Sequence, residues 1–550
     1  MNGDILIDLL KWQNWWVANS KNFKLKAMFD IIIRNGILID GSGKPMYRAD
    51  IGIKDDQIVK IGDLHNEKSE IEIDATGRLV CPGFIDVNNH SDTYWKIFTN
   101  PSLESLVYQG ITTIVGGNCG SSLAPLLGAK AISSVQKWSN LSQTSIDWLT
   151  MAEFLDVVFR NKLSVNFATL VGQATLRRSI LGDDTRHLKA KEVDFLANKL
   201  AVAMKEGALG MSSGLIYSHA RSTTEDELVR LAQTIEKYHG VYVTHMRNES
   251  SDFVAATDEA IEIARKSKVK LHISHLKVTG EKNWEMMDEA LAAISRANEV
   301  GLDVSFDVFP YTNTGSVLYT LLPSWVSDGG KKMMLSRLKN SQLRAKVVAE
   351  MKESDIDYSK IEIAISPLNK TLARRKISDI AVSQEKSIED AVIDMLIAAE
   401  GRVIISMDVL SEENIEKAIA HPASIIATNG SGYTDSHGNT GEVVHPRSFG
   451  AFPRVLAKYV LGKKIISWED AIRKMTSFPA QKFGIEKRGE LKESYFADIV
   501  IINQDEIRDL ATPENPYQYN KGIDYVLVNG QIVLQDGVYN GERVGCVIGR

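Results

Sequence analysis

A strand–helix unit that recurs between residues 79 and 430 constrains the fold of this 550-residue chain more than any other feature. Each unit has a short apolar β-rich segment and a polar or glycine-rich tip. In most units a segment with the 3.6-residue periodicity of an amphipathic helix follows, as in residues 225–239 and 255–267. Because alternating strands and helices imply a parallel sheet, eight such units predict an α/β fold closed as a (β/α)₈ TIM-type barrel. The strand candidates are residues 78–87, 111–118, 165–173, 208–217, 240–246, 269–277, 302–311 and 423–430.

The segments outside this series predict two further parts of the molecule. Both ends of the chain contain short strand-like runs joined by Gly and Asp turns, including the NG and DG pairs that favour hairpins. We therefore expect a small composite β-sandwich built from residues 28–82 and 485–550, beside a barrel domain of residues 83–484. Residues 311–421 carry two more strand-like runs and basic helical segments, which predicts an insertion lobe before the last barrel strand, over the barrel mouth.

Residues 1–27 are expected to form an N-terminal extension outside the fold. They lack the basic start and the small-residue cleavage site of a signal peptide. A strand-like run begins directly after Met28, so Met28 is an alternative start to Met1.

The composition argues against several classes of partner. The chain is 44% hydrophobic and 24% charged, which is ordinary for a globular protein. Its net charge of -6 gives no basic surface for nucleic acid, and no apolar run reaches the roughly 18 residues that a membrane helix needs. The three cysteines, Cys81, Cys119 and Cys546, are too few for a disulfide framework and suit a reducing compartment, so we expect a cytoplasmic protein. The oligomeric state stays open.

Four of the predicted strand tips carry side chains of the kinds that bind metal ions. In strand order these side chains are His90, Cys119, His245 and His275. Because the carboxyl ends of barrel strands meet at the active-site face, we expect them to lie close together. A thiolate with two imidazoles favours Zn²⁺, and three protein ligands leave the open position that a catalytic zinc site needs. The alternative is that Cys119 is a small buried apolar residue and the histidines are hydrogen-bonded loop residues.

The motifs around these tips resemble a known family. The segments FIDVNNHSD, GGNCGSSLAP, LGMSSGLIY, THMRNES, ISHLKVTG, FDVFPYT and HPRSFGAFPRVL together are similar to the N-acyl-D-amino-acid deacylases of the amidohydrolase superfamily, over residues 28 to 548. The resemblance implies a metal-dependent hydrolase that converts an N-acyl-D-amino acid into a carboxylate and a free D-amino acid.

The resemblance also implies a role for individual positions. It assigns the tightly held zinc to Cys119, His245 and His275, and places His90 at a second, weaker metal site. It assigns the substrate to three further positions, with Lys277 and Arg447 on the substrate carboxylate and Tyr311 facing the substrate. A guanidinium fork suits a carboxylate geometrically, although Arg447 could also be a loop-stabilising arginine.

Three strand tips depart from the family pattern. Asn88 stands at a family histidine position, Gln173 where relatives usually have histidine, and Asn429 where the family has aspartate. The family aspartate moves a proton to the leaving nitrogen, whereas an amide has no proton to exchange near neutral pH. Losing such a group typically costs about 10²–10⁴ in rate. Asn88 and Asn429 also weaken the second metal site around His90.

Several readings could compensate for these changes. A shifted register would make His90 and Asp92 the ligand pair of the first strand. Asp435 or His437 could replace the missing aspartate, and Asn429 could deamidate because Gly430 follows it.

Three functions therefore compete. The first is a zinc amidohydrolase acting on a small N-acylated amino acid. The second is a catalytically impaired homologue that binds zinc and a carboxylate ligand without efficient turnover. The third is an amidohydrolase that opens cyclic amides, but the fourth tip, LGMSSGLIY, lacks the lysine that bridges two metals in those enzymes.

Overall fold

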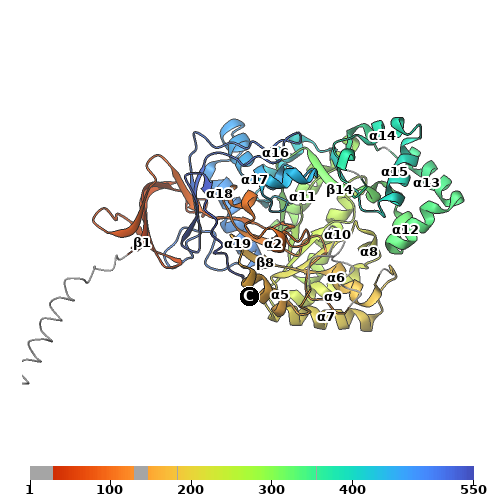
Figure 1. The fold of residues 1–550 in the computed structure, drawn as a ribbon. Coiled ribbons are helices and arrows are strands. Elements are labelled where there is room, and N and C mark those ends of the chain that lie inside the picture. Colours follow the sequence, from red (N-terminus) through yellow and green to blue (C-terminus); the bar gives the residue numbers. More distant parts are fainter. Residues whose placement is uncertain (1–28, 129–145, 183, 355, 369, 550) are drawn as a thin grey trace, which may run out of the picture.

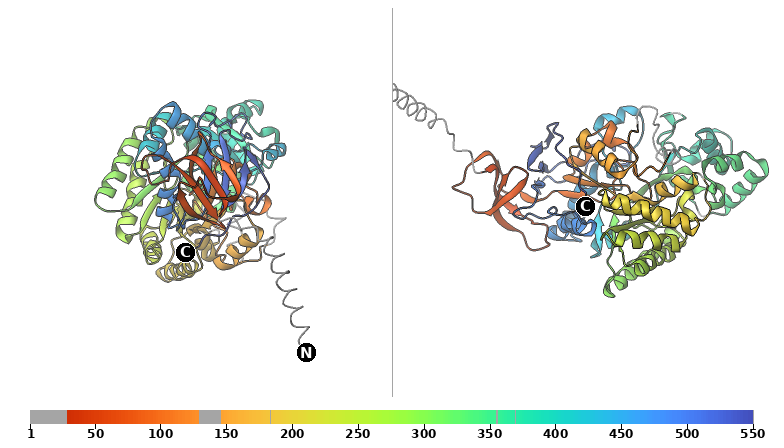
Figure 2. Two further views of the ribbon diagram at one scale, coloured as in Figure 1. Left: turned by 90° about the vertical axis from the view of Figure 1, so that its left-hand side faces the viewer. Right: turned by 90° about the horizontal axis from the view of Figure 1, so that it is seen from below.

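The computed structural model describes residues 29–128, 146–182, 184–354, 356–368 and 370–549, so the predicted extension at 1–27 lies outside the described residues. The molecule is elongated, with a terminal β-sheet at one end, parallel strands ringed by helices in the centre, and a helical lobe at the other end (Figure 1). Viewed from the sheet end, the N-terminal strands lie in front of the central helices (Figure 2).

The central parallel strands form two sheets. A three-stranded sheet has the order β6-β7-β8, and a six-stranded sheet has the order β17-β13-β12-β11-β10-β9. The bounds are β6 Phe84–Asp86, β7 Ile111–Gly116, β8 Asn166–Thr169, β9 Val171–Gly172, β10 Gly210–Gly214, β11 Val241–His245, β12 Lys270–Ile273, β13 Val304–Val308 and β17 Ser424–Ile426. Each of the eight predicted strand segments contains an observed strand, and the α/β class is confirmed.

The two sheets meet at both of their edges. Only Leu170 separates β8 from β9 along the chain, and an isolated parallel bridge joins Asn89, after β6, to Gly430, after β17. The hydrogen-bond ladder is therefore interrupted at these two points, where the prediction has one continuous closed barrel.

The first predicted strand splits into two strands that belong to different sheets. β5 (Leu79–Pro82) pairs with strands from both chain ends, whereas β6 pairs with β7. Gly83 lies at the division, and a Cβ there would come within 2.1 Å of the Thr112 side chain. The Thr112 side chain packs so closely against the backbone at this point that only glycine leaves room for it.

The helices between the strands begin where the sequence supplies a capping side chain. Thr150, Thr224 and Ser411 accept hydrogen bonds from backbone N–H groups of the helices they precede, which are otherwise unpaired. The helices of the central part are α2 Lys96–Thr99, α3 Glu104–Val107, α5 Met151–Asn161, α6 Gln173–Leu181, α7 Ala190–Lys205, α8 Ser218–Arg221, α9 Glu225–Glu236, α10 Phe253–Ser267, α11 Met286–Glu299, α16 Glu412–Ala420, α17 Arg447–Arg454, α18 Trp468–Met475 and α19 Ser477–Phe483.

Strands from both termini share one nine-stranded sheet. Its order is β21-β20-β19-β18-β5-β1-β2-β3, with β4 paired to β1, and the antiparallel pair β5–β18 joins the two ends of the chain. The remaining bounds are β1 Phe29–Leu38, β2 Tyr47–Lys54, β3 Gln57–Gly62, β4 Ser69–Asp74, β18 Ile499–Ile502, β19 Ile523–Val528, β20 Gln531–Gln535 and β21 Val538–Tyr539.

The lobe lies between β13 and β17 and has a hydrophobic core of its own. A three-stranded antiparallel sheet, in the order β14-β16-β15, packs with helices around residues such as Leu318, Val347 and Ile405. The elements are β14 Asn313–Val317, α12 Gly330–Lys339, α13 Ser341–Glu353, β15 Ile361–Ile365, α14 Ile377–Ser383, α15 Ile388–Ala398 and β16 Ile404–Asp408. The strand-like runs at 361–366 and 402–406 are thus strands of the lobe.

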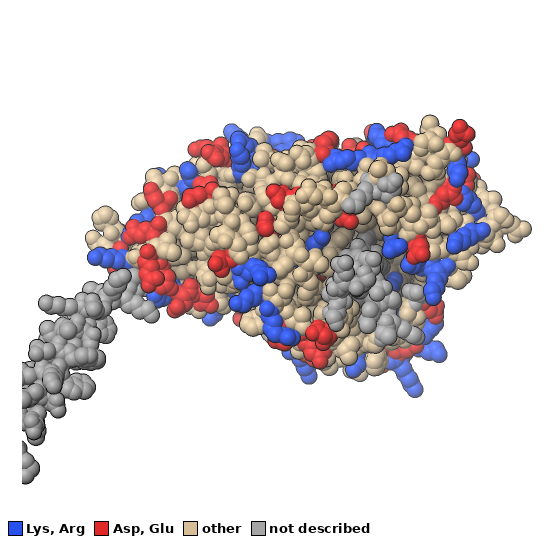
Figure 3. Space-filling model, viewed as in Figure 1, with Lys and Arg blue, Asp and Glu red and all other residues tan. Residues whose placement is uncertain are grey.

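On the face drawn in Figure 3, acidic and basic side chains are interspersed. Within the described part of the chain, no helix combines the length and the apolar character needed to cross a bilayer.

A buried charge network connects the terminal sheet to the central strands. Asp498 accepts hydrogen bonds from Asn166 Nδ2 at 3.0 Å and from the backbone N–H of Asn529 at 2.8 Å, and it is paired with Arg488. Both charged side chains of the pair are 3% exposed. Because the pair is buried, removing one partner would leave the other charge without compensation.

We therefore expect Asp498→Ala to lower the free energy of unfolding by about 3–5 kcal/mol, the usual cost of breaking a buried ion pair. Urea denaturation followed by circular dichroism measures this loss. The matched control is Asp156→Ala, which breaks the exposed pair with Arg160 on α5 and should change stability far less. Equal losses in the two variants would contradict the role of the network.

Candidate metal centre

Three strand ends bring one thiol and two imidazoles together. Cys119 follows β7, His245 ends β11 and His275 follows β12, and one ligand atom from each lies within 4.8 Å of the other two. The Cys119 Sγ is 3.6 Å from His275 Nε2. All three side chains are buried. The structure thus places the predicted tight-site ligands in one cluster.

The cluster has the properties of a divalent-metal site. Both ring nitrogens of His245 are buried and have no hydrogen-bond partner among the described residues, which a protein interior rarely tolerates. Burial lowers the pKa of His275 to about 3, so its imidazole is neutral, as a metal ligand must be. Burial raises the pKa of Cys119 to about 12, so a thiolate here requires a nearby cation. A sulfur with two imidazole nitrogens suits a divalent ion such as zinc.

The backbone at three of the tips adopts the left-handed conformation that non-glycine residues usually avoid. The φ angles are 53° at Cys119, 37° at His275 and 47° at Asn429. Such conformations cost on the order of 1–3 kcal/mol each and persist where the surrounding structure enforces them. Their concentration here indicates that side-chain placement at the site outweighs local backbone preference.

Two buried carboxylates support the cluster, and the sequence analysis did not identify either. Glu249 Oε1 lies 3.1 Å from His275 Nδ1 and 3.6 Å from His245 Nε2, and Glu249 is paired with Lys277. Burial alone would raise the pKa of Glu249, but Lys277 and the two histidines outweigh burial and hold that pKa well below its usual range. In the sequence, the position of Glu249 four residues after His245 is the feature that could have indicated its place beside the metal ligands.

Asp307 is the second supporting carboxylate. It ends the strand that neighbours β12, and its Oδ1 accepts the backbone N–H of His275 at 2.9 Å. Its Oδ2 accepts a hydrogen bond from His272 Nε2 at 2.9 Å. In the sequence, the feature that could have indicated this role is an acidic residue inside an apolar strand. Asp307 therefore fixes the backbone of the tip that carries His275, in the way that outer carboxylates orient metal ligands.

The weaker site of the family pattern contains amides where ligands are expected. Asn88 Nδ2 donates to both oxygens of Asp307 at 3.2 Å, and His90 Nε2 donates to Asn429 Oδ1 at 3.0 Å. His90 Nε2 is also 4.0 Å from Cys119 Sγ, so His90 lies at the edge of the cluster. Burial and the charge of Arg447 lower the pKa of His90 to about 4.

The residues considered as compensation for Asn88 and Asn429, and the third substituted position, lie outside the cavity wall. Asp92 accepts the backbone N–H of Gly117 at 2.7 Å and is almost fully buried. His437 lies 3.0 Å from Glu442. Gln173 donates to Glu227 and Thr223 beneath the tip of β9. Among the described residues, Asp92, Gln173, Asp435 and His437 are not part of the cavity wall.

The three predicted substrate-binding residues have different surroundings. Lys277 lines the cavity, but its ammonium is already paired with Glu249. Arg447 opens α17 and lies over the Phe309 ring at 4.9 Å, while its buried Nε and Nη1 have no hydrogen-bond partner in the described structure. Burial lowers the pKa of Arg447 only to about 10, so it stays charged at neutral pH. Tyr311 instead lies behind the wall and directs its hydroxyl to the Pro446 carbonyl at 3.4 Å.

A histidine joins the Arg447 loop to the lobe. His445 Nε2 donates to the Asn313 carbonyl at 2.9 Å, and its Nδ1 accepts the backbone N–H of Arg447 at 3.1 Å. These two bonds require a neutral ring, which agrees with a pKa that burial and Arg447 hold well below the usual value.

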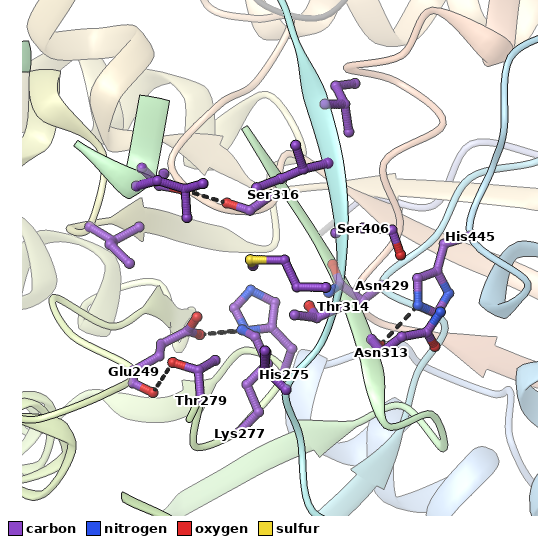
Figure 4. Close-up of a pocket in the computed structure, with 18 of the residues that line it drawn as sticks. Glu249, His275, Lys277, Thr279, Asn313, Thr314, Ser316, Ser406, Asn429 and His445 are labelled. Atoms are coloured by element: carbon purple, nitrogen blue, oxygen red, sulfur yellow. Dashed lines mark hydrogen bonds and ion pairs between the residues drawn. The ribbon is translucent and has the colours of Figure 1, made fainter. Parts of the chain in front are cut away.

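The metal-ligand cluster faces a cavity of about 1420 Å³ between the central strands and the lobe. The walls include the metal-ligand cluster, His90, Asn429 and Arg447. Figure 4 shows His275 near the middle of the site, with Glu249 on one side and Asn429 and His445 on the other. Thr314 and Ser316 from β14 and Ser406 from β16 complete this view, so the lobe sheet forms part of the cavity wall.

Comparison with known proteins agrees with this geometry. The sequence profile described as the amidohydrolase family matches residues 72–357 and 429–534. A profile of the N-terminal domain of the urease alpha-subunit matches residues 16–80. A D-aminoacylase of Alcaligenes xylosoxydans xylosoxydans is 32% identical over 522 residues, covering 95% of this chain and 98% of the relative.

Solved structures extend the likeness to the fold. An N-acyl-D-glutamate deacylase from Bordetella bronchiseptica, solved with zinc and a phosphonate that mimics the reaction tetrahedral intermediate, superposes with a TM-score of 0.80 at 28% identity and covers 95% of this chain and 100% of its own. A D-aminoacylase with a binuclear metal center, described by one-metal activation and second-metal attenuation, has a TM-score of 0.80 at 30% identity, with the same coverage. The resemblance read from the motifs is confirmed, and this chain belongs to the D-aminoacylase family of amidohydrolases, which are hydrolases of amide carbon–nitrogen bonds.

Proposed function

We propose that this protein is a zinc-dependent deacylase that hydrolyses the amide of an N-acyl-D-amino acid to a carboxylate and a free D-amino acid. The observation that carries the proposal is the buried guanidinium of Arg447, whose Nε and Nη1 have no hydrogen-bond partner among the described residues, in the same cavity as the cluster of Cys119, His245 and His275. A buried guanidinium with unpaired donors calls for an anion, and a carboxylate is an acceptor with which arginine pairs strongly. The D-configuration rests on the relatives, which act on N-acyl-D-amino acids by name.

The roles of the residues follow from their contacts. The ligand cluster would hold one divalent cation, which supplies the Lewis acidity of a metal-dependent hydrolase when bound. Arg447 binds the substrate carboxylate and orients the amide toward the cluster. Glu249 and Asp307 keep the two imidazoles in place, and Lys277 is already paired with Glu249, whereas Arg447 has no carboxylate partner among the described residues. Tyr311 acts indirectly, by supporting the backbone of Pro446 beside Arg447.

The architecture completes this proposal. We infer that the two parallel sheets act as one closed (β/α)₈ barrel, because the Asn89–Gly430 bridge joins the strands at its seam. We also propose that the strands of the nine-stranded terminal sheet make up the composite domain expected from residues 28–82 and 485–550, and that residues 311–421 are the insertion lobe. The three cysteines are free thiols, which fits a reducing cytoplasm.

The metal cluster is tested by Cys119→Ala. We expect the purified wild-type protein to hold about one zinc per chain and to release free amine from N-acetyl-D-amino acids, and the variant to lose both properties. Elemental analysis measures the zinc content, and an assay for free amine measures turnover. Cys81→Ala, in β5 of the terminal sheet, is the matched control and should keep metal and turnover. Full metal content in Cys119→Ala would contradict the assignment.

The carboxylate site is tested by Arg447→Met. Hydrogen bonds to charged groups contribute about 1.5–3 kcal/mol, so kcat/KM for the free acid should fall roughly 10- to 150-fold. Against the methyl ester of the same substrate, the variant should show little further loss. Arg247→Met is the matched control, because Arg247 lines the same cavity but is already bonded to Glu259. An equal loss for acid and ester would contradict carboxylate binding by Arg447.

A second candidate function is binding without efficient turnover. It is favoured by the hydrogen bond of Asn429 to His90, since both groups are held in place and the Asn429 amide cannot take up or release a proton near neutral pH. In that case the amide at Asn429 slows hydrolysis, while the metal ligands and Arg447 remain able to bind.

Asn429→Asp separates the two functions. A carboxylate at this position should raise kcat by about 10²–10⁴, because it restores a group that can carry a proton. Adding Asn88→His should raise the zinc content above one per chain. The control is Asn248→Asp, which places a new carboxylate elsewhere in the cavity wall and should give no gain. An unchanged kcat in Asn429→Asp would show that another group moves the proton and that the natural protein is a full deacylase.

A further inference from the structure

The cavity continues from the metal-ligand cluster into the hydrophobic core of the lobe. Seven of its wall residues are aliphatic and either belong to that core or pack against it, namely Leu321, Leu322, Ile356, Ile361, Ile363, Ile405 and Met407. We call these seven residues the aliphatic subsite. The core that stabilises the lobe thus also forms one wall of the substrate cavity.

The register of the lobe sheet connects this subsite to the metal centre. Met407 of β16 pairs with Thr314 of β14 on one side and with Ile361 of β15 on the other, so the three side chains share a face. Thr314 and His275 both line the cavity (Figure 4). Two residues further along, Ile405 pairs with Ser316 and Ile363 and continues this face into the lobe core.

Two hydroxyls beside the subsite have partners. Ser316 and Thr320 hydroxyls are 3.1 Å apart, and Thr320 donates to the Val317 carbonyl at 2.7 Å. Glu362 also lines the cavity, but it alternates with Ile361 and Ile363 along β15 and so projects from the opposite face of the sheet. An apolar group that enters the subsite therefore does not strip these two hydroxyls of their hydrogen bonds.

We propose that the aliphatic subsite binds the acyl chain of the substrate, so that the preferred substrates are D-amino acids with medium- or long-chain fatty acyl groups. The inference rests on the proposed deacylase function and names its substrate class. The cavity of about 1420 Å³ exceeds the roughly 300–1,000 Å³ that encloses a drug-sized ligand, and an N-acetyl amino acid would fill little of it. The side chain of an amino acid is short, whereas an acyl chain can extend from the scissile carbonyl into the lobe.

The size of the expected preference follows from apolar burial. Transfer of one methylene group from water into an apolar site favours binding about fourfold. The value of kcat/KM should therefore rise about fourfold for each added methylene until the subsite is full. Lengthening the amino-acid side chain with the acyl group held as acetyl should give no such series.

The experiment compares N-acetyl-, N-butanoyl-, N-hexanoyl-, N-octanoyl- and N-decanoyl-D-alanine with the zinc-loaded full-length protein. A second series varies the side chain of N-acetyl-D-amino acids from alanine to norleucine. A rise with acyl length alone supports the proposal. A flat or falling acyl series, or a rise with side-chain length alone, overturns it.

Two variants test the location of the subsite. Met407→Trp and Ile356→Trp place a larger ring in partly buried positions of its wall, and each should reduce the decanoyl-to-acetyl ratio of kcat/KM by about tenfold or more, the equivalent of two or more methylene contacts. Val382→Trp on α14, where Val382 is 78% exposed, is the control and should keep the ratio. Thermal unfolding checks that each variant is folded, and an unchanged ratio in both folded wall variants overturns the proposal.

Binding measurements keep this inference separate from the proposed function. Isothermal titration calorimetry of N-decanoyl- and N-acetyl-D-alanine needs no turnover. Tighter binding of the decanoyl compound without hydrolysis of any substrate would support the subsite and contradict the deacylase. Hydrolysis of the acetyl compound with no tighter binding of the decanoyl compound would support the deacylase and overturn the subsite.

Discussion

The structure depends on the burial of a thiol and two imidazoles at neighbouring strand ends. Without a cation the arrangement is unfavourable, because both nitrogens of His245 lack hydrogen bonds within the described structure and the Cys119 thiol resists ionisation. The left-handed backbone at Cys119 and His275 adds local strain. A divalent ion would take up the lone pair of one His245 nitrogen and stabilise the thiolate. A bound metal would therefore favour this arrangement of the strand tips.

Around this cluster, amides stand where the resemblance to the family implies ionisable groups. Asp307 accepts the backbone N–H of His275, and Asn88 donates its amide to that same carboxylate. The Asn88 Oδ1 is buried and has no hydrogen-bond partner in the described structure, so this amide is satisfied on its donor side alone. Asn429 Oδ1 accepts a hydrogen bond from His90. The two amides therefore hold Asp307 and His90 by hydrogen bonds, but neither can take up or release a proton near neutral pH.

The sequence predicted the site better than its surroundings, for a physical reason. Side chains such as Cys119 and His245 lie at the ends of strands, and parallel strands bring their carboxyl ends to one edge. Glu249 and Asp307 were missed because their roles depend on which tips become neighbours, which spacing alone does not give. The division at Gly83 was also hidden, since it follows from contact with Thr112, far along the chain. Likewise Tyr311 matched a motif, but only the fold directs its hydroxyl to Pro446.

Hydrogen bonds of His445 connect the lobe to the loop that carries Arg447. The proposed binding site for the acyl chain is therefore joined to the proposed carboxylate site. His445 bonds to β14 through Asn313 and to the backbone of Arg447, so a shift of the lobe sheet displaces the guanidinium as well. Burial and the charge of Arg447 hold the pKa of His445 well below its usual value, so the ring is neutral near neutral pH and can make both bonds. An acyl chain that orders the lobe core would thereby fix Arg447 relative to the metal ligands. Binding energy gained far from the scissile amide can then improve its alignment, which is how remote substrate contacts raise kcat and not only affinity.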